Sequence, residues 1–308
     1  MSNNTKKDQD LDRDFKNIWH PCTQMKDHES VPPLHIEKGE GIYLVDKDGK
    51  RYMDVISSWW VNLFGHNHPR LNKALTDQAS RMAHVMFAGV THTPAIDLAD
   101  SLVKLTPPNL TRVFFSDNGS TSIEVALKMS LQYWQQVGQA QRTRFIHLTG
   151  GYHGETLGAL SVCGIGLFRD KFENSLMKNL EVNGPDCYRC PYGLQPESCK
   201  AECFEPMERA IKENRETVAG VIIEPLVQGA AGMKMYPPIY LEKLERACSD
   251  FKTHTIYDEV AVGFGRTGAL FVCGEYGLKP TFLCLSLLLV SSSLCLVYGL
   301  QIGSFWWV

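Results

Sequence analysis

"RVFFSDNGSTSIEVALKMSLQYW", residues 112–134, decides the fold class. It begins with a short apolar strand pattern, Arg112–Ser116, and ends with a long helical pattern. Gly119 and Ser120 form the turn between the two, where glycine permits a tight bend and serine presents a free hydroxyl. A strand that runs through a tight turn into a helix is the basic unit of an α/β fold.

The start of this helix is a candidate anion site. Thr121 and Glu124 have the spacing of a capping box. Free backbone N–H groups and the helix dipole both favour a phosphate at such a position. A plain capped helix explains the same residues, so this stretch alone leaves both interpretations open.

The same alternation of strands and helices continues along the chain. The patterns predict strands at "RFIHL", "AGVIIEP", "HTIYDEV" and "TFLCLS", with helices at Glu205–Glu213 and Pro238–Phe251 among those between them. Such alternation predicts an α/β protein with a mostly parallel sheet flanked by helices. Ligands of these sheets bind at the carboxyl ends of the strands.

The N-terminal part has a different pattern. Residues 1–20 are polar and predict a mobile arm, and "GIYLVDKDGKRYMDV" predicts two short strands around a turn at Asp46–Gly49. Helical patterns follow at Arg70 to about Met86 and at Ala95–Leu105.

Composition limits the functional class. The chain has 308 residues, of which 44% are hydrophobic and 21% charged, as is ordinary for a globular enzyme. A net charge of −3 without any basic run gives no indication of nucleic-acid binding. The first residues lack the apolar region of a signal peptide, so the cytoplasm is the expected compartment. Its ten cysteines are then expected to be thiols or metal ligands rather than disulfides.

A second candidate ligand-binding stretch is "TGGYHGETLGALSVCG", which follows the strand "RFIHL". Its glycines let the backbone approach a ligand closely. Tyr152 could stack on a planar ring, and His153 could act as an acid or base. A glycine-rich connection with a surface histidine explains this stretch equally well.

Acidic residues end two of the predicted strands. Asp258 and Glu259 follow "HTIY", and Glu224 follows "VII". Such acids could bind a metal, pair with a cationic ring nitrogen, or form a structural salt-bridge network. A phosphate cradle, an aromatic ring and an acid are together what a pyridoxal 5′-phosphate (PLP) site requires, because the acid keeps the pyridine nitrogen protonated. The element still missing is a lysine for the Schiff base.

The chain resembles the class III aminotransferases of PLP fold type I. The matching stretches are "IWHPCTQM", "DVISSWWVNLFGHNHPRLNKAL", "HVMFAGVTHTPAIDLA", "DNGSTSIEVALKMSLQYW", "GGYHGETLGALSVCG", "IIEPLVQGAAGM" and "DEVAVGFGRTG". They span about residues 15–286. The resemblance implies PLP as the cofactor and a homodimer as the assembly.

The resemblance also implies roles at the cofactor. Gly119 and Ser120 would hold the PLP phosphate. Tyr152 would pack at the cofactor and contact the substrate, and Asp258 would bind the pyridine nitrogen.

Further residues would shape the substrate pocket. Trp59 would line the acceptor site, Glu155 would be a nearby acid, and Cys22 stands where relatives often carry a substrate-recognising tyrosine. The implied reaction of biotin biosynthesis transfers the amino group of S-adenosylmethionine to 8-amino-7-oxononanoate and yields 7,8-diaminononanoate. Both half-reactions would share one site.

The chain departs from the family at its C-terminal end. Leu287 stands at the position of the Schiff-base lysine, and no lysine follows Lys279. We therefore predict negligible transaminase activity for the chain as written. The expected organisation is an arm and part of the small domain (1–65), an incomplete large PLP-binding domain (66–286) and an unrelated apolar tail (287–308), without the C-terminal small domain.

The tail has three possible interpretations. The chain is a transaminase with a shifted reading frame, a non-catalytic fragment, or a membrane-tethered variant. The tail is long enough to span a bilayer, but its serines and the absence of a basic flank disfavour an anchor.

A second departure is the cluster "CYRCPYGLQPESCKAEC". Its cysteines have the spacing C-x2-C-x8-C-x3-C, which suggests a zinc or iron–sulfur site; they are Cys187, Cys190, Cys199 and Cys203. A loop with reduced thiols is the favoured alternative.

Overall fold

The computed structural model describes residues 9–195, 198–287 and 292–298. The chain divides into two compact units, Met1–His84 and Val85–Val308. The division lies further along the chain than the predicted boundary between residues 65 and 66.

The first unit contains a small antiparallel sheet with the order β1-β2-β3. The predicted hairpin is confirmed: Gly49 donates its N–H to Asp46 O and adopts φ +83°. Residues 9–17 of the predicted arm form an amphipathic helix, which was not predicted. The elements of this unit are α1 (Gln9–Asn17), η1 (Met25–Glu29), β1 (Ile36–Glu40), β2 (Tyr43–Asp46), β3 (Arg51–Met53), α2 (Ser57–Trp60) and α3 (Pro69–Arg81).

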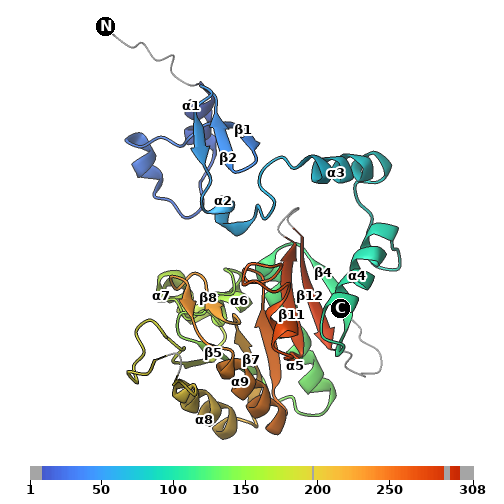
Figure 1. The fold of residues 1–308 in the computed structure, drawn as a ribbon, viewed down its shortest axis with the longest axis vertical. Helices are drawn as coiled ribbons and strands as arrows, with labels where there is room; N and C mark the ends of the chain where they lie inside the picture. The colour runs from blue at the N-terminus through green and yellow to red at the C-terminus, as the bar shows by residue number, and fades with distance from the viewer. Residues whose placement is uncertain (1–8, 196–197, 288–291, 299–308) are drawn as a thin grey trace. The chain divides into compact units, whose positions relative to one another are not determined.

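The second unit is built on a seven-stranded sheet with the order β4-β12-β11-β10-β7-β5-β6 (Figure 1). The pairs β11–β10, β10–β7, β7–β5 and β5–β6 are parallel, which confirms the predicted mostly parallel α/β fold. The strands are β4 (Leu110–Ser116), β5 (Arg144–Leu148), β6 (Leu180–Val182), β7 (Val218–Ile223), β10 (His254–Asp258), β11 (Phe282–Leu287) and β12 (Ser292–Tyr298). A separate two-stranded sheet pairs β8 (Val227–Gln228) with β9 (Lys234–Met235).

Helices connect these strands. They are α4 (Thr93–Leu105), α5 (Gly119–Gln136), α6 (Leu157–Ser161), α7 (Gly166–Arg169), η2 (Asp170–Ser175), η3 (Glu202–Phe204), α8 (Glu205–Glu213), α9 (Ile239–Asp250) and α10 (Val272–Glu275). The helix predicted at Glu205–Glu213 has the predicted bounds, and the other predicted helices differ by a few residues at their ends.

Two apolar clusters cover the faces of this sheet. Residues of α8 and α9 pack with one set of strand side chains, including Tyr257, and residues of α5 and α6 pack with the other, including Ile256. Neighbouring residues of one strand point to opposite faces, so both faces are buried. All six residues of β7 are buried, as expected for a continuous apolar run in a central parallel strand.

Part of the predicted tail belongs to the sheet. Strand β12 runs antiparallel between β11 and β4, and its residue Cys295 pairs with Cys284 and Phe114. This strand was not predicted from the sequence. The remaining tail residues, 288–291 and 299–308, lie outside the described residues. Among the residues that the structure describes, no helix is long and apolar enough to cross a membrane.

Candidate functional site

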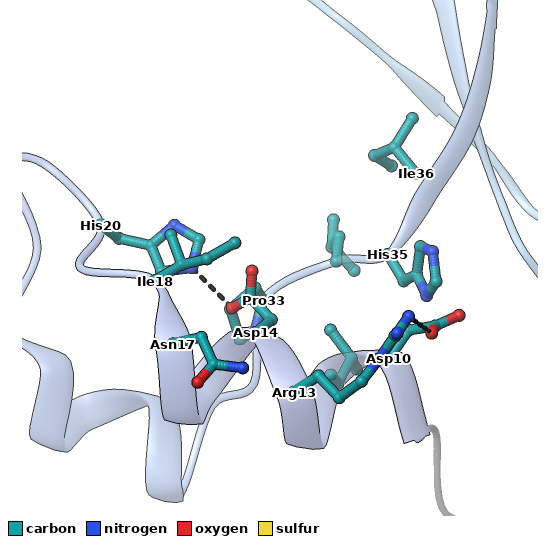
Figure 2. A pocket seen from close by; sticks show the side chains of 11 residues that line it. Asp10, Arg13, Asp14, Asn17, Ile18, His20, Pro33, His35 and Ile36 are labelled. Carbon is teal, nitrogen blue, oxygen red and sulfur yellow. Dashed lines mark hydrogen bonds and ion pairs between the residues drawn. The ribbon is translucent and has the colours of Figure 1, made fainter.

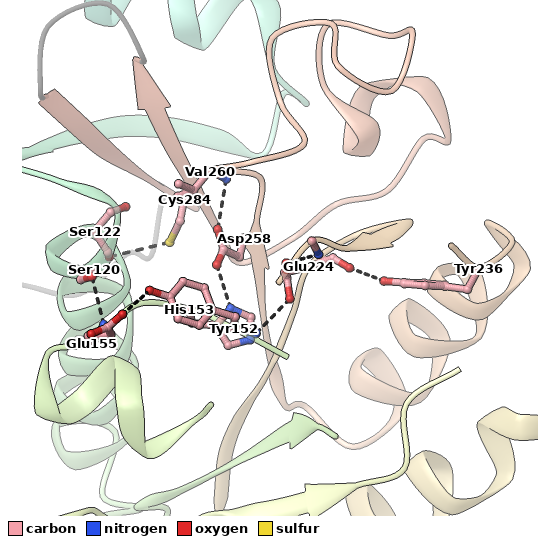
Figure 3. A network of polar contacts seen from close by, with 11 residues as sticks. Ser120, Ser122, Tyr152, His153, Glu155, Glu224, Tyr236, Asp258, Val260 and Cys284 are labelled. Atoms are coloured by element: carbon pink, nitrogen blue, oxygen red, sulfur yellow. Dashed lines mark hydrogen bonds and ion pairs between the residues drawn. The ribbon is translucent and has the colours of Figure 1, made fainter. Parts of the chain in front are cut away.

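The predicted cofactor residues of the second unit meet at the carboxyl edge of the sheet. Ser120 lies in the first turn of α5, Tyr152 and His153 follow β5, Glu224 follows β7, and Asp258 ends β10. Figure 3 shows these side chains joined by polar contacts. Parallel strands place their carboxyl ends at one edge, and this brings together residues far apart in the sequence.

The start of α5 is capped by Asn118. Its side chain accepts the N–H of Thr121 at 3.0 Å, and Thr121 Oγ1 accepts the N–H of Asn118 at 3.0 Å. The predicted capping box at Thr121 and Glu124 is therefore wrong, because the box begins three residues earlier. Glu124 instead accepts the N–H of Gly158 at 2.7 Å. The helix still directs its first N–H groups towards the edge of the sheet, as an anion site needs.

Ser120 packs directly against the glycine-rich loop after β5. Its Oγ accepts the N–H of Glu155 at 3.3 Å, which leaves the hydroxyl proton available to a ligand. A Cβ on Gly154 would overlap Ser120 Oγ and lie 2.9 Å from Ser120 Cα. Glycine at position 154, with φ +111°, is thus required for the close approach of the two segments.

Asp258 is buried and is held through both carboxylate oxygens. Oδ2 lies 2.7 Å from His153 Nδ1, and Oδ1 accepts the N–H of Val260 at 3.1 Å. The His153 and Asp258 side chains are only 1% and 6% exposed. His153 is therefore a buried partner of the predicted nitrogen-binding acid and not a surface residue of the loop.

Glu224 is a second buried acid beside this pair. Burial raises its pKa from 4.5 to about 7, against a smaller lowering by His153, while Asp258 raises it further. Its two carboxylate oxygens accept the N–H groups of Tyr152 and Gly229 at 3.0 and 2.9 Å. The backbone oxygen of Glu224 accepts a hydrogen bond from the Tyr236 hydroxyl. Glu224 thus ties the loop that carries Tyr152 to the end of β7.

Tyr152 and Glu155 interact at the outer side of the network. The Tyr152 hydroxyl donates to Glu155 Oε1 at 2.9 Å, and the Tyr152 ring lies 5.2 Å from the Phe168 ring. Glu155 is exposed, so this acid is accessible to a polar ligand. The contact holds the tyrosine ring in one orientation beside the start of α5.

Glu259 has a different role from its neighbour Asp258. It is fully buried and accepts the N–H groups of Val272 and Cys273 at 2.8 and 2.9 Å. These bonds satisfy the start of the short helix α10. The two adjacent acids therefore separate into one that faces the candidate site and one that stabilises a loop.

Trp59 and Cys22 belong to the first unit, so their predicted contacts with a substrate stay predictions. Trp59 is 60% exposed and lies in a turn where residues 57–60 all have positive φ between 49° and 64°. Asp54 stabilises this left-handed turn by accepting hydrogen bonds from the N–H and hydroxyl of Ser58 at 3.0 and 2.7 Å. Cys22 is an exposed free thiol with φ 54°.

The four cysteines of the cluster lie in the segment between β6 and α8. Among the described residues, no group of three or more His, Cys, Asp or Glu side chains is arranged to hold a metal ion. All four cysteines are free thiols. Burial raises the pKa of Cys203 to about 11, and the neighbouring cysteines raise it further. Cys203 is thus a protonated thiol at neutral pH, and metal binding by the cluster stays a prediction beside the favoured alternative of reduced thiols.

The first unit also contains an open pocket of about 450 Å³ between α1 and the segment before β1 (Figure 2). Two polar contacts join lining residues: His20 Nε2 lies 2.7 Å from Asp14 Oδ2, and Arg13 donates to Asp10 Oδ1 at 2.5 Å. None of the predicted site residues lines this pocket.

The pairing of His153 with Asp258 was not predicted from the sequence. The two residues are 105 positions apart, and no local pattern joins them. Each was identified only as a possible acid, base or ring partner in its own stretch. The signal that could have linked them is the rule that ligand residues gather at the carboxyl ends of parallel strands.

Comparisons with known proteins agree with the fold. The family described as aminotransferase class III matches residues 24–291. An adenosylmethionine-8-amino-7-oxononanoate aminotransferase of Geobacter sulfurreducens is 45% identical over 276 residues, which are 89% of this chain and 61% of that protein. The chain therefore spans about three fifths of the length of this relative.

Two solved structures are similar to this one. The crystal structure of an adenosylmethionine-8-amino-7-oxononanoate aminotransferase from Methanocaldococcus jannaschii has a TM-score of 0.86 and 39% identity. An omega transaminase of Pseudomonas jessenii, in complex with PMP, has a TM-score of 0.88 and 31% identity. Both alignments cover 94% of this chain and 65% of the other chain.

Proposed function

Because the chain belongs to the class III aminotransferases, we propose that its second unit is the PLP-binding region of an enzyme of biotin biosynthesis. The proposed reaction transfers the amino group of S-adenosylmethionine to 8-amino-7-oxononanoate and gives 7,8-diaminononanoate. The names of the similar proteins support these substrates. We further propose a homodimer in the cytoplasm, as is implied by the family resemblance.

One observation carries the cofactor assignment. The buried Asp258 carboxylate and the N-terminus of α5 lie at the same edge of the sheet, and the loop carrying Tyr152 connects them (Figure 3). An acid for a ring nitrogen and an N–H cradle for a phosphate are the two fixed points that PLP needs. When bound, PLP supplies an electron sink for the chemistry at the substrate's amino carbon.

The residues of this chain would divide the remaining tasks. Gly119 and Ser120 would bind the phosphate through the N–H groups of the first helical turn and the Ser120 hydroxyl. The Asp258 carboxylate would hold the proton on the ring nitrogen. Tyr152 would cover the cofactor and exclude water from it, and Glu155 would orient Tyr152 through its hydroxyl. Trp59 and Cys22 would contact the substrate.

This chain has a leucine at the position of the lysine that would form the Schiff base with PLP. Leu287 ends β11, the strand next to the one that ends in Asp258. A leucine has no amine to bond the cofactor or to move a proton. We therefore propose that the chain as it stands binds the cofactor without a covalent bond and has negligible transaminase turnover.

The experiment uses pyridoxamine 5′-phosphate (PMP), because this form of the cofactor binds without a lysine. Isothermal titration should show one PMP site per chain. Ser120→Ala and Asp258→Asn should each weaken binding by about tenfold or more, as expected for the loss of a hydrogen bond to a charged group. Equal affinity of the two variants and the unsubstituted chain would overturn the assignment.

The lysine position is tested by Leu287→Lys. After incubation with PLP and borohydride, peptide mapping should find a reduced adduct at residue 287 in this variant. The matched control is Ser286→Lys, one residue earlier on the same strand, where alternation directs the side chain to the other face. Equal labelling of both variants would show that the end of β11 does not face the cofactor.

A further inference from the structure

Two side chains of α5 contact the loop after β5. Ser120 and Glu124 are four residues apart in this helix and therefore lie on the same face of it. Ser120 Oγ accepts the N–H of Glu155 at 3.3 Å. Glu124 Oε1 accepts the N–H of Gly158 at 2.7 Å and that of Ala159 at 3.4 Å. The loop and the start of α6 are thus held against α5 at two successive points.

The start of α6 depends on Glu124 because the helix has no cap of its own. The first N–H groups of a helix have no partner within the helix. Thr156 is the N-cap residue of α6, and threonine often caps a helix through its hydroxyl, but no side-chain cap forms here. Among the described residues, Thr156 Oγ1 is buried without a hydrogen-bond partner. The acceptor comes instead from Glu124, which is 34 positions before Gly158.

Gly158 makes room for this contact. A Cβ at residue 158 would overlap Glu124 Oε2 and would lie 2.6 Å from Glu124 Cδ. Glycine is otherwise unfavourable in a helix, because it loses more conformational entropy than alanine. The carboxyl group of Glu124 therefore occupies the space that a side chain at position 158 would fill.

We propose that Glu124 is a positioning residue of the proposed cofactor site. Through the first N–H groups of α6 it holds the loop after β5 close to α5, so that Ser120 and Tyr152 contact the same ligand. Tyr152 lies in this loop, and its hydroxyl donates to Glu155, whose N–H Ser120 accepts. The role of Glu124 towards a cofactor rests on the proposed function, but its contact with α6 does not.

The first test follows hydrogen exchange in the chain without any ligand, by NMR. The N–H groups of Gly158 and Ala159 should exchange about tenfold faster in Glu124→Ala than in the unsubstituted chain, because they lose their acceptor. Glu124→Gln keeps a side-chain oxygen at the same distance from the backbone and should retain most of the protection. Unchanged exchange in Glu124→Ala would overturn the proposal.

The second test measures PMP affinity by isothermal titration. Glu124→Ala should weaken binding about three- to tenfold, whereas Glu124→Gln should bind PMP nearly as well as the unsubstituted chain. The matched control is Asn179→Ala at the other end of α6, where Asn179 Nδ2 donates to Ser161 O at 2.9 Å. This control loosens the same helix but should leave PMP affinity within about twofold. Equal losses in Glu124→Ala and Asn179→Ala would mean that any loosening of α6 has this effect, and the positioning role would fail.

Gly158→Ala tests the same contact from the other side. The added Cβ would displace the Glu124 side chain, so this substitution should weaken PMP binding about as much as Glu124→Ala does. In the Glu124→Ala background the space is free, and Gly158→Ala should cause no further loss. Additive losses would show that the two residues act independently and would contradict the proposal.

These measurements separate the inference from the proposed function. If the unsubstituted chain does not bind PMP, the proposed function fails and the role of Glu124 towards a cofactor fails with it, while hydrogen exchange still decides its contact with α6. If PMP binds equally well with and without the Glu124 side chain, the proposed function stands and the positioning role fails. Urea unfolding of each variant checks that weaker binding does not come from an unfolded chain.

Discussion

Gly154 has no side chain, and this lets the loop after β5 approach Ser120 at the start of α5 closely. Gly154→Ala would place a Cβ 2.9 Å from Ser120 Cα and would force alanine to adopt φ +111°. We expect a loss of about 2–4 kcal/mol in the free energy of unfolding, from overpacking and backbone strain together. Urea denaturation measures it.

Gly138→Ala is the matched control for this substitution. Gly138 also has a positive φ, +77°, but nothing lies within 4 Å of the position that a Cβ would occupy there. Only the backbone strain of about 1–2 kcal/mol should remain in this variant. Equal losses in both variants would mean that the contact between Gly154 and Ser120 adds nothing to stability.

The burial of His254 should make the stability of the fold depend on pH. Burial lowers its pKa from 6.5 to about 3, and its Nδ1 lies 2.8 Å from Ser130 Oγ. Between pH 6.5 and about 3, His254 is therefore protonated in the unfolded chain but neutral in the folded chain. The free energy of unfolding consequently falls as the pH drops from 6.5 towards 3. The expected slope from His254 is about 1.4 kcal/mol per pH unit.

The His254→Gln variant isolates this contribution. Its free energy of unfolding is measured by urea denaturation between about pH 4.5 and 6.5, inside the span from the folded pKa of about 3 to the ordinary value of 6.5. The free energy should fall less steeply than that of the unsubstituted chain. Glu224 acts in the opposite direction over part of this range, because its folded pKa is raised, but it is present in both proteins. Parallel pH profiles would contradict the prediction.

Individual site residues could be predicted from the sequence because each occupies a strand end. Ser120, Tyr152 and Asp258 follow apolar runs, and the structure brings them to one edge. Their partners could not be predicted. Asp258 and Glu259 are adjacent and chemically alike, but alternation along the chain directs one to His153 and the other to the start of α10.

The helix α5 is the element on which the proposed phosphate site depends. Asn118→Ala removes the side chain that accepts the Thr121 N–H. The free energy of unfolding should fall by about 1 kcal/mol, as is usual for the loss of an N-cap. Thermal or urea unfolding measures the loss.

Gln135→Ala controls for the general effect of alanine in α5. Gln135 is exposed in the last turn of the helix and offers no cap. Its substitution should change the free energy of unfolding by less than about 0.5 kcal/mol. A similar effect at both positions would show that the Asn118 cap does not stabilise the helix.

The elements themselves were predicted with uneven success. Apolar runs buried on both faces, such as β7, stand out because every residue of the strand is apolar or small. The helix α1 was missed because its polar composition also suits a mobile arm. The cap of α5 was assigned to the wrong residues because Thr121 and Glu124 have the right spacing, whereas Asn118 has the right backbone conformation.

At the scale of the whole molecule, a substitution in β12 tests whether residues 292–298 belong to the sheet. Cys295 pairs with strands on both sides. Cys295→Pro removes a backbone N–H from a central strand, and the free energy of unfolding should fall by about 1–3 kcal/mol more than in Cys295→Ala, which keeps that N–H. Equal unfolding midpoints in urea would show that β12 does not pair there.

The sequence by itself determined the α/β class, the family, and the strand ends that carry Ser120, Tyr152 and Asp258. These follow from local periodicity and from motifs that are contiguous in the chain. The sequence also places a leucine, which has no side-chain amine, at position 287. Only the tertiary structure decided that His153 holds Asp258, that Glu259 serves a loop and that residues 292–298 enter the sheet. These outcomes depend on contacts between distant segments, and such contacts are set by the burial and pairing of the whole sheet rather than by any local pattern.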